Sequence, residues 1–438
     1  MTADNLLSSK VFAVVGAARE EWKVGHAIFK NLLSNKHILA LPVNPNAAEI
    51  LGKRCYKDIF EVPYNIDCVI IAVKAEIVLS IMQQAARRKI KNVIIISAGF
   101  SEIGNFKLEE EVMKIASENG ISVLGPNVFG FVNPYTDINT SFFQGVPEKG
   151  NLAFISQSGA LGVGILDLAL KEKIGFSGFV ALGNSMMLDF SDFIEYYSKD
   201  RNTKVIALYM EGLKEGRGKR FIEACKSCKK PIIVLKSGKS KEGQRASRSH
   251  TASLASESGV YESIFKQAGI IEVNSMRELF QTTELIIKYG KIGRRACIVT
   301  NAGGLGVLCS DSCSYYNVEV PSLPANVLEK LNKILPPAWS RNNPIDLIGD
   351  ALAERYWDVL ARLDPENWFD FFIVLLTPQY MTECEKTAEL LIHLKKPVVA
   401  CFYGGEKIDE AKKILKKQDI PLFSDVYGLG RALGKIII

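Results

Sequence analysis

Short apolar runs rich in β-branched residues alternate along the chain with longer amphipathic segments. Such runs lie at 11–16, 38–44, 68–73, 92–99, 121–127, 152–159, 204–211, 231–238, 296–304, 369–378 and 397–405. Continuously apolar runs separated by helix-length segments predict parallel sheets that helices cover on both faces. Ligands bind such sheets at the carboxyl ends of the strands, where glycine-rich turns lead into helices. Functional residues are therefore expected in the turns that follow the runs.

Two irregular segments divide this pattern into three parts. Residues 133–151 are polar and turn-rich without a helical period, and residues 288–295 form a short glycine-containing basic joint. A chain of 438 residues suggests about three domains at roughly 150 residues each. We expect domains at 1–130, 146–287 and 293–438.

An internal repeat links the second and third of these domains. FISQSGALGVGILD (154–167) and IVTNAGGLGVLCSD (298–311) align without a gap and share glycines at 159/303 and 162/306. Each segment predicts a strand, a glycine turn and a helix at the start of a domain. We expect an α/β protein in which the second and third domains are both doubly wound.

Composition and charge argue against several classes of protein. Apolar residues make up 47% of the chain and the formal net charge is +6, which fits a globular protein and gives no concentrated basic patch for nucleic acid. No apolar run approaches the roughly 20 residues of a membrane helix, and MTADNLLSSK lacks the features of a signal peptide. A cytoplasmic protein is therefore expected, with no nucleic-acid or membrane partner.

The nine cysteines are odd in number and scattered through apolar strands, which predicts buried free thiols rather than disulfides. Cys225 and Cys228 form a single C-x-x-C, two ligands where zinc needs four. No metal site is predicted.

The first glycine turn, GAAREEWKVGHA (16–27), follows a predicted strand and opens a helix. Such a turn suits a phosphate at a helix N-terminus, and Arg19 and Lys23 would favour it, unless they are simply the solvated start of a helix. The turn lacks G-x-G-x-x-G, and the second run ends at Asn44-Pro45 without the acidic residue that binds an NAD ribose. A conventional NAD site is therefore disfavoured.

A second candidate anion site lies at Ser156-Gln157-Ser158-Gly159, where two hydroxyls and backbone N–H groups meet at a helix start. The alternative is that a serine only caps the helix. No P-loop sequence occurs in the chain.

His250 stands apart from the other three histidines. It lies in KSGKSKEGQRASRSHTASLA (236–255), which is rich in glycine, serine, alanine and basic residues, a composition suited to a histidine that carries negative charge. Glu211 ends another strand of the same domain. A carboxylate bound to one ring nitrogen fixes the tautomer and leaves the other nitrogen nucleophilic, so His250 and Glu211 form a candidate catalytic pair.

Ten segments, in order along the whole chain, carry a resemblance to a known family. They are GAAREEWKVGHAIFKNL, VNPN, SAGFSEIG, GPNVFGFVN, ISQSGALG, LGNSMMLDFSDFIEYY, LYMEGL, KSGKSKEGQRASRSHTASLA, TNAGGLGVL and NPIDLIGDA. Together they closely resemble the α subunit of ADP-forming (NDP-forming) acyl-CoA synthetases, of which acetyl-CoA synthetase is the usual member. They resemble succinyl-CoA synthetase α subunits more distantly.

The resemblance implies a Rossmann-like CoA-binding domain followed by two flavodoxin-like domains. It implies the reversible reaction of acyl-CoA, phosphate and ADP to acid, CoA and ATP, through an acyl phosphate and a phosphohistidine. His250 matches the phosphohistidine and Glu211 the glutamate that orients it. The implied phosphate site is Ser156, Gln157, Ser158 and Gly159. The implied CoA site comprises Gly16, Ala17, Ala18, Arg19, Lys23, Val24, Asn44, Pro45, Val73, Lys74, Ser97, Ala98, Gly99, Phe100 and Asn127.

The chain departs from the family pattern at a few positions. Val128 stands where cysteine is usual, Lys74 where proline is common, and Met186 and Met187 replace smaller or polar residues. The two methionines could reshape the acyl pocket, which puts acetate as the acid in question.

No segment resembles an ATP-grasp domain, so the resemblance implies a separate ATP-grasp β subunit that binds ADP or ATP with Mg²⁺, in an α₂β₂ assembly. Three other interpretations of the chain make different demands on its sequence. A CoA-binding regulatory protein without turnover would not need the intact His250 segment. A succinyl-CoA synthetase α subunit would stop after two domains. An NAD-linked dehydrogenase would need the missing acidic residue after the second strand.

Overall fold

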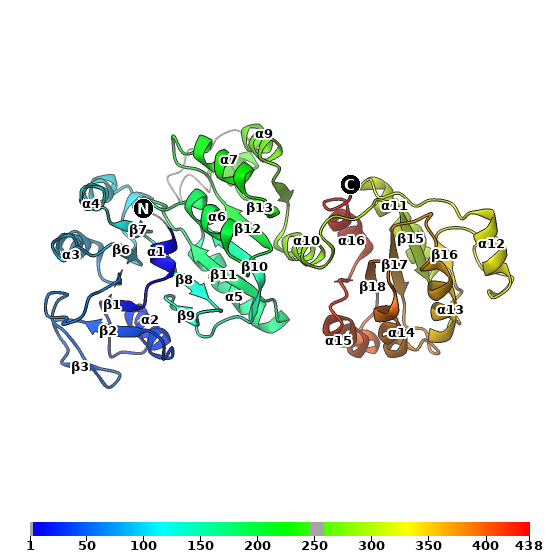
Figure 1. Cartoon of the computed structure of the whole chain (residues 1–438), viewed down its shortest axis with the longest axis horizontal. Helices are drawn as coiled ribbons and strands as arrows, with labels where there is room; N and C mark the ends of the chain where they lie inside the picture. The colour runs from blue at the N-terminus through cyan, green and yellow to red at the C-terminus, as the bar shows by residue number, and fades with distance from the viewer. Residues whose placement is uncertain (1–2, 246–257) are drawn as a thin grey trace. The chain divides into compact units, whose positions relative to one another are not determined.

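The computed structural model describes residues 3–245 and 258–438. They form two compact units, Met1–Asn274 and Ser275–Ile438 (Figure 1). Each unit is built from parallel β-sheet with helices on its faces.

The first sheet of unit 1 has five parallel strands in the order β2-β1-β5-β6-β7. Its strands are β1 (Val11–Val15), β2 (Leu39–Val43), β5 (Cys68–Ile71), β6 (Asn92–Ile95) and β7 (Ser122–Leu124). Its helices are α1 (Ala3–Leu7), α2 (Val24–Leu33), α3 (Ala75–Arg87) and α4 (Phe106–Asn119), with a 3₁₀ turn, η1, at Ser101–Ile103. A small hairpin of β3 (Glu49–Ile50) and β4 (Lys53–Arg54) follows β2.

Both faces of this sheet are buried, as continuously apolar runs require. Phe12 and Val14 pack into one hydrophobic cluster with residues of α2, whereas Ala13 and Val15 pack into another with residues of α3 and α4. Because successive side chains of a strand point to opposite faces, every position of β1 has an apolar neighbour. This explains why the run carries no polar alternation.

The second sheet of unit 1 has seven strands in the order β14-β13-β12-β10-β11-β8-β9. Five are parallel: β10 (Lys149–Ser156), β11 (Phe176–Ala181), β12 (Val205–Met210), β13 (Ile232–Lys236) and β14 (Ile271–Val273). Two short antiparallel strands complete it, β8 (Phe131–Asn133) and β9 (Ile138–Asn139). The helices are α5 (Gly159–Glu172), α6 (Phe190–Lys199), α7 (Gly218–Ser227) and α9 (Ser258–Ala268).

The segment 133–151 is not a plain linker between two domains. It contains β9 and the start of β10, and β8 pairs with β11 through Phe131 and Val180. The strands β8 and β9 could not be predicted from the sequence, because a strand of two or three residues is too short to show an alternating pattern.

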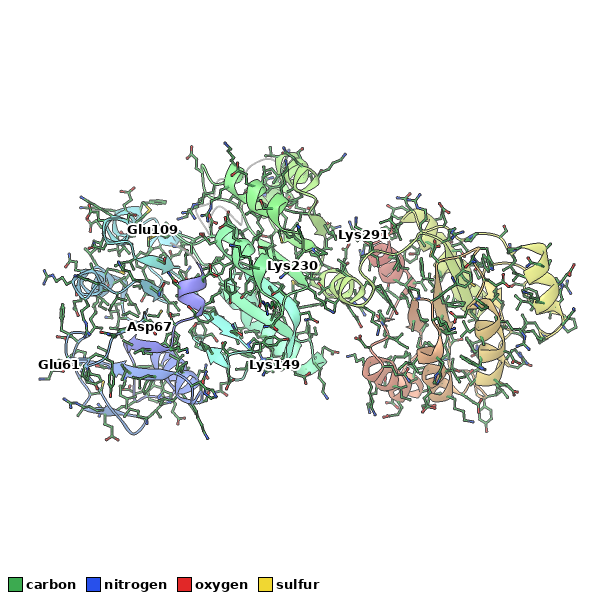
Figure 2. All side chains as sticks on the ribbon, viewed as in Figure 1. Glu61, Asp67, Glu109, Lys149, Lys230 and Lys291 are labelled. Carbon is green, nitrogen blue, oxygen red and sulfur yellow. The ribbon has the colours of Figure 1, made fainter. Side chains whose placement is uncertain are left out.

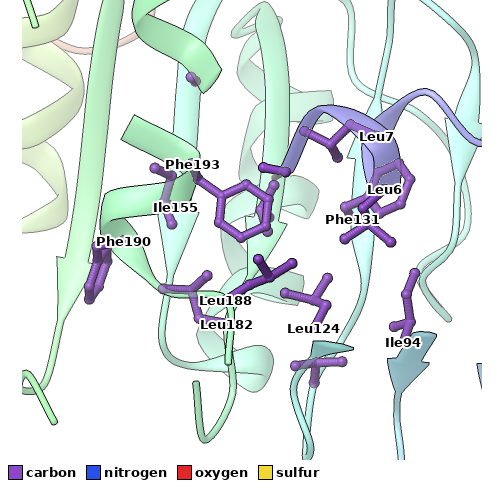
Figure 3. Close-up of a cluster of buried hydrophobic side chains, with 14 of the residues drawn as sticks. Leu6, Leu7, Ile94, Leu124, Phe131, Ile155, Leu182, Leu188, Phe190 and Phe193 are labelled. Atoms are coloured by element: carbon purple, nitrogen blue, oxygen red, sulfur yellow. The ribbon is translucent and has the colours of Figure 1, made fainter. Parts of the chain in front are cut away.

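The two sheets of unit 1 share one hydrophobic core. Figure 3 shows Leu124 and Ile94 of the first sheet in the same cluster as Ile155 of the second. Phe193 of α6, completely buried, belongs to it as well. This shared core fixes the turns of the first sheet relative to those of the second.

Unit 2 contains a five-stranded parallel sheet in the order β16-β15-β17-β18-β19. Its strands are β15 (Ala296–Thr300), β16 (Ile345–Asp346), β17 (Phe371–Leu376), β18 (Val398–Phe402) and β19 (Leu422–Phe423). Its helices are α10 (Met276–Tyr289), α11 (Gly303–Tyr315), α12 (Ala325–Asn332), α13 (Ala353–Leu363), α14 (Cys384–Leu390), α15 (Asp409–Lys417) and α16 (Val426–Leu433), with 3₁₀ turns η2 (Leu391–His393) and η3 (Glu406–Ile408).

Helix α10 lies in unit 2, where Tyr289 donates its hydroxyl hydrogen to the carbonyl oxygen of Val398 at 2.7 Å. Most of this helix falls within the second domain expected from the sequence, 146–287, whereas the helix belongs to unit 2 of the structure.

Each of the eleven apolar runs contains a strand, and the predicted α/β class with parallel sheets is confirmed. All nine cysteines are free thiols, eight of them buried, as expected. Burial raises the pKa of Cys225 to about 12, which is typical of an unreactive thiol.

Candidate functional site

The turn after β1 is held by two glycines in close contact with backbone. A Cβ atom on Gly16, whose φ is +91°, would lie 2.3 Å from the carbonyl oxygen of Ala72. A Cβ atom on Gly25, in the first turn of α2, would lie 2.0 Å from the carbonyl oxygen of Gly16. The N-terminus of α2 therefore packs directly on the turn, which is the close approach that phosphate-binding turns need.

Backbone and side-chain hydrogen bonds join the other turns of this sheet to the first. Asn44 donates from Nδ2 to the carbonyl oxygen of Ala17 at 2.8 Å. The Ser97 hydroxyl donates to the carbonyl oxygen of Val73, and the Asn127 backbone N–H donates to the carbonyl oxygen of Ser97 at 2.9 Å. The structure thus brings these predicted CoA residues to one edge of the sheet, and several of them position the turns.

The side chains of the predicted CoA residues divide into exposed and buried groups. Arg19, Lys23 and Lys74 are exposed, and Lys23 forms an ion pair with Glu20 at 3.3 Å. Phe100 is completely buried in the core, so its side chain is not available to a ligand. The remaining predicted residues are Ala17 and Ala18, which are buried, Gly16, Val73 and Gly99, which are part-buried, and Val24, Pro45 and Ala98, which are exposed.

Ser156 and Ser158 shape the turn between β10 and α5. The Ser158 backbone N–H donates to Ser156 Oγ at 3.1 Å, and Ser156 Oγ donates to the Ser158 carbonyl oxygen at 2.8 Å. Ser158 also caps α5, because its side chain accepts from the Leu161 backbone N–H. The hydroxyls stabilise the turn, while the first turn of the helix supplies N–H groups without intrahelical acceptors.

The corresponding turn of unit 2 has the same local geometry. The Ala302 backbone N–H donates to Thr300 Oγ1 at 3.0 Å, and Thr300 Oγ1 donates to the Ala302 carbonyl oxygen at 3.1 Å. The repeat in sequence is therefore a repeat in structure. The capping residue differs, since Ala302 has no side-chain oxygen where Ser158 does.

Gln157 connects the predicted phosphate turn with Glu211. Its Oε1 accepts from the backbone N–H groups of Glu211 at 2.6 Å and Gly212 at 3.0 Å, and its Nε2 donates to the Gly212 carbonyl oxygen at 2.7 Å. Glu211 directly follows β12, the neighbour of β10 in the sheet, and is 9% exposed. The structure thus places Glu211 beside the Ser156–Gly159 turn.

Lys236 reaches the same peptide from the next strand. It ends β13, and its Nζ donates to the Glu211 carbonyl oxygen at 2.8 Å. From the sequence, Lys236 is only one of several basic residues near His250. Its position at a strand end, next to the strand that ends at Glu211, was the available signal.

His250 itself lies outside the described residues, within 246–257. The catalytic pair of His250 and Glu211 stays a prediction.

A polar network at the junction of the two sheets was not anticipated. Asn184 donates from Nδ2 to Glu102 Oε2 at 2.6 Å and to Glu109 Oε2 at 3.2 Å. Glu109, labelled in Figure 2, also accepts from Lys214 Nζ at 2.7 Å. Burial alone would raise the pKa of Glu109, but Lys214 and the hydrogen bonds from Ser101 and Asn184 lower it. Glu102 in turn accepts from the backbone N–H groups of residues 99 and 100, which belong to the predicted CoA site.

The two methionines that depart from the family pattern pack with the core of the first sheet. Met186 is 1% exposed and packs with the first-sheet core, and Met187 is partly buried against it. Arg217 donates to the carbonyl oxygens of both methionines and pairs with Asp189 at 2.7 Å. The segment that carries them is therefore fixed by its backbone.

Within 3–245 and 258–438, no group of three or more His, Cys, Asp or Glu side chains is arranged to hold a metal ion. In the same part of the chain, no helix is long and apolar enough to span a bilayer.

Three family models match successive parts of the chain. They are the CoA binding domain at residues 10–134, the succinyl-CoA ligase like flavodoxin domain at 149–286 and the ligase-CoA domain at 296–429.

Curated relatives match over almost the whole chain. ADP-forming acetate–CoA ligase I of Archaeoglobus fulgidus is 40% identical over 98% of this chain and 62% of its own. The α subunit of ADP-forming acetate–CoA ligase II of Pyrococcus furiosus is 38% identical over 96% of this chain and 94% of its own. This chain thus spans about three fifths of the first relative and nearly all of the second.

A solved structure has the same fold throughout. It is the dinucleotide-forming acetyl-coenzyme A synthetase 1 of Candidatus Korarchaeum cryptofilum in complex with phosphate and ADP. It is 34% identical, with a TM-score of 0.92 over 99% of this chain and 96% of that one.

Proposed function

The chain belongs to the ADP-forming acyl-CoA synthetase family, and from that premise we propose that it carries the CoA-binding and phosphotransfer half of such an enzyme. The observation that supports this most directly is the Gln157–Glu211 contact. It joins a helix-start anion site to the backbone of Glu211, whose carboxylate would orient a phosphorylated histidine.

The proposed reaction has three balanced steps. A phosphate oxygen attacks the thioester carbonyl of acyl-CoA, the C–S bond breaks, and CoA leaves as a thiolate that takes up a proton. An imidazole nitrogen of His250 then attacks the phosphorus of the acyl phosphate, and the carboxylate leaves as the P–O bond breaks. Finally, a terminal oxygen of ADP attacks the phosphohistidine, which gives ATP and restores the neutral imidazole.

The residues of unit 1 have separate roles in these steps. The turns at 16–24, 44–45, 73–74, 97–100 and 127 would hold CoA, with Arg19 and Lys23 facing its phosphates. The helix start at Ser156–Gly159 would hold the phosphate that attacks the thioester. Glu211 would accept a hydrogen bond from one ring nitrogen of His250 and stabilise the positive charge that develops on attack.

The nucleotide site is proposed to lie on a further module. None of the three matched regions is an ATP-grasp domain, so we assign ADP, ATP and Mg²⁺ to such a module. A separate β subunit in an α₂β₂ assembly is the arrangement we propose, because the named α subunit of Pyrococcus furiosus has nearly the extent of this chain.

The full chain should bind CoA and not NAD. Asn44 follows β2 and bonds to the first turn, so no carboxylate is available there for an NAD ribose. Calorimetric titration should give heat with CoA and none with NAD. Removing a hydrogen bond to a charged group costs about 1.5–3 kcal/mol, so Arg19→Ala should weaken CoA binding roughly tenfold.

Lys91→Ala is the matched control for this titration, because Lys91 is exposed and its Nζ donates to the Asn119 carbonyl oxygen, away from the turns. Tight NAD binding without a CoA signal would refute the assignment of the first domain.

The purified chain should not make ATP from acetyl-CoA, phosphate and ADP by itself, because the nucleotide-binding module is missing from the matched regions. A coupled ATP assay on homogeneous protein tests this, and an added ATP-grasp subunit should restore activity. Sustained ATP formation by this chain alone would contradict the two-subunit proposal. CoA binding without any phosphoenzyme would instead favour a regulatory protein.

A further inference from the structure

Lys236 is unusual for a lysine in this protein because it is buried. Its side chain is 9% exposed, and among the residues that the structure describes no other lysine is buried to this degree. Lysine is almost never buried without partners. Burial of Lys236 at the end of β13, beside Glu211, therefore points to a specific role for its ammonium group.

The ammonium group is enclosed by specific partners. Its Nζ donates to the carbonyl oxygens of Glu211, at 2.8 Å, and of Ser237. It also lies 4.6 Å from the centre of the Tyr261 ring, within range of a cation–π interaction. The Tyr261 hydroxyl accepts from the Leu213 backbone N–H at 2.8 Å, which ties this ring to the segment that follows Glu211.

These contacts fix the Glu211 peptide from both sides. Gln157 Oε1 holds its N–H, and Lys236 Nζ holds its carbonyl oxygen. With both backbone groups fixed, the Glu211 side chain starts from a fixed position, which restricts where its carboxylate can lie. A general base or an orienting carboxylate needs this restriction, since small displacements weaken catalysis strongly.

Charges on neighbouring elements act on the same ammonium group. Burial lowers the pKa of Lys236 to about 8, Glu211 and Glu272 oppose that change, and Lys239 adds to it. Lys239 is itself paired with Glu272, which lies on β14. The charge of Glu211 therefore stabilises the protonated form of Lys236.

We propose that Lys236 is a positioning residue of the phosphotransfer site, which fixes Glu211 and balances its charge when a phosphoryl group is nearby. The inference rests on the proposed function for its catalytic consequence. The electrostatic coupling of Lys236 with Glu211 does not depend on turnover.

The coupling can be measured without activity. In protein with ¹³C at lysine Cε, the Lys236 signal, assigned by its loss in Lys236→Arg, should titrate near pH 8. Glu211→Gln removes the attraction to the carboxylate, so the titration of Lys236 should move to lower pH. The signal of Lys239 serves as the internal control and should move much less. An unchanged Lys236 titration in Glu211→Gln would overturn the proposal.

The catalytic consequence is tested by phosphoenzyme formation from acetyl-CoA and ³²P-phosphate. The labelling rate of the natural chain should fall as pH rises through about 8, the value at which Lys236 loses its proton. Lys236→Met should label roughly tenfold more slowly, the effect of losing one charge-assisted hydrogen bond. Lys236→Arg, which stays charged, should label without the decline near pH 8.

Lys226→Met is the matched control, because Lys226 is exposed on α7 and is not among the charges that act on Lys236, and it should keep the decline near pH 8. If Lys236→Met and Lys236→Arg both label with the rate and pH profile of the natural chain, Lys236 has no positioning role. If the natural chain takes up no label, the proposed function fails, and the Lys236 titration still decides whether the coupling exists.

Discussion

Replacing His250 with alanine is expected to abolish formation of a phosphoenzyme from acetyl-CoA and labelled phosphate, while CoA binding is unchanged. The neutral imidazole is the form that attacks phosphorus, and a histidine with a pKa near 6.5 is mostly neutral at pH 7. The label should be acid-labile and base-stable, as for a phosphorylated imidazole. Incorporation by His250→Ala at the natural rate would show that the nucleophile lies elsewhere.

Glu211→Gln should slow the same labelling by about 10²–10⁴-fold, the usual contribution of a general acid–base group. The backbone of residue 211 makes the contacts with Gln157 and Lys236, so the amide variant keeps the peptide in place and removes only the charge. Glu215→Gln is the matched control, because Glu215 is exposed four residues further along. Equal rates for the two variants would exclude a role for the Glu211 carboxylate.

Replacing Gly25 with alanine should remove most of the affinity for CoA. The added methyl group would lie 2.0 Å from the Gly16 carbonyl oxygen, which belongs to backbone and has little room to move. Helix α2 must therefore shift away from the turn, which separates its N-terminus from the bound phosphates. Overpacking of this kind also costs about 1–3 kcal/mol of stability.

Calorimetry with CoA and thermal unfolding measure the two effects separately. Gly164→Ala is the control, because a Cβ atom on Gly164 meets nothing within 4 Å. That variant should keep CoA affinity and gain about 0.5–1 kcal/mol, since alanine is the better helix residue. Natural CoA affinity in Gly25→Ala would show that the close contact is not part of the binding site.

The order of strands and turns along the chain was predictable because each strand and turn has a local sequence pattern. A strand buried on both faces needs an unbroken apolar run, and each of the eleven runs contains one. The turn at Ser156–Gly159 was found in the same way, since a hydroxyl-rich glycine turn after such a run signals a helix start. The strand β11 was missed because glycine interrupts its sequence, FSGFVA. The short strand β8 pairs with the distant strand β11, and β9 in turn pairs with β8.

The contacts of the candidate site were decided by the tertiary structure. The sequence by itself determined that Gln157, Glu211 and Lys236 stand at or just after the ends of strands. It did not determine that β10, β12 and β13 are neighbours in the sheet, with Ser156 opposite Tyr209 and Met210 opposite Lys236. Strand order and register depend on the packing of the whole core, so only the folded chain brings the two side chains to the Glu211 peptide.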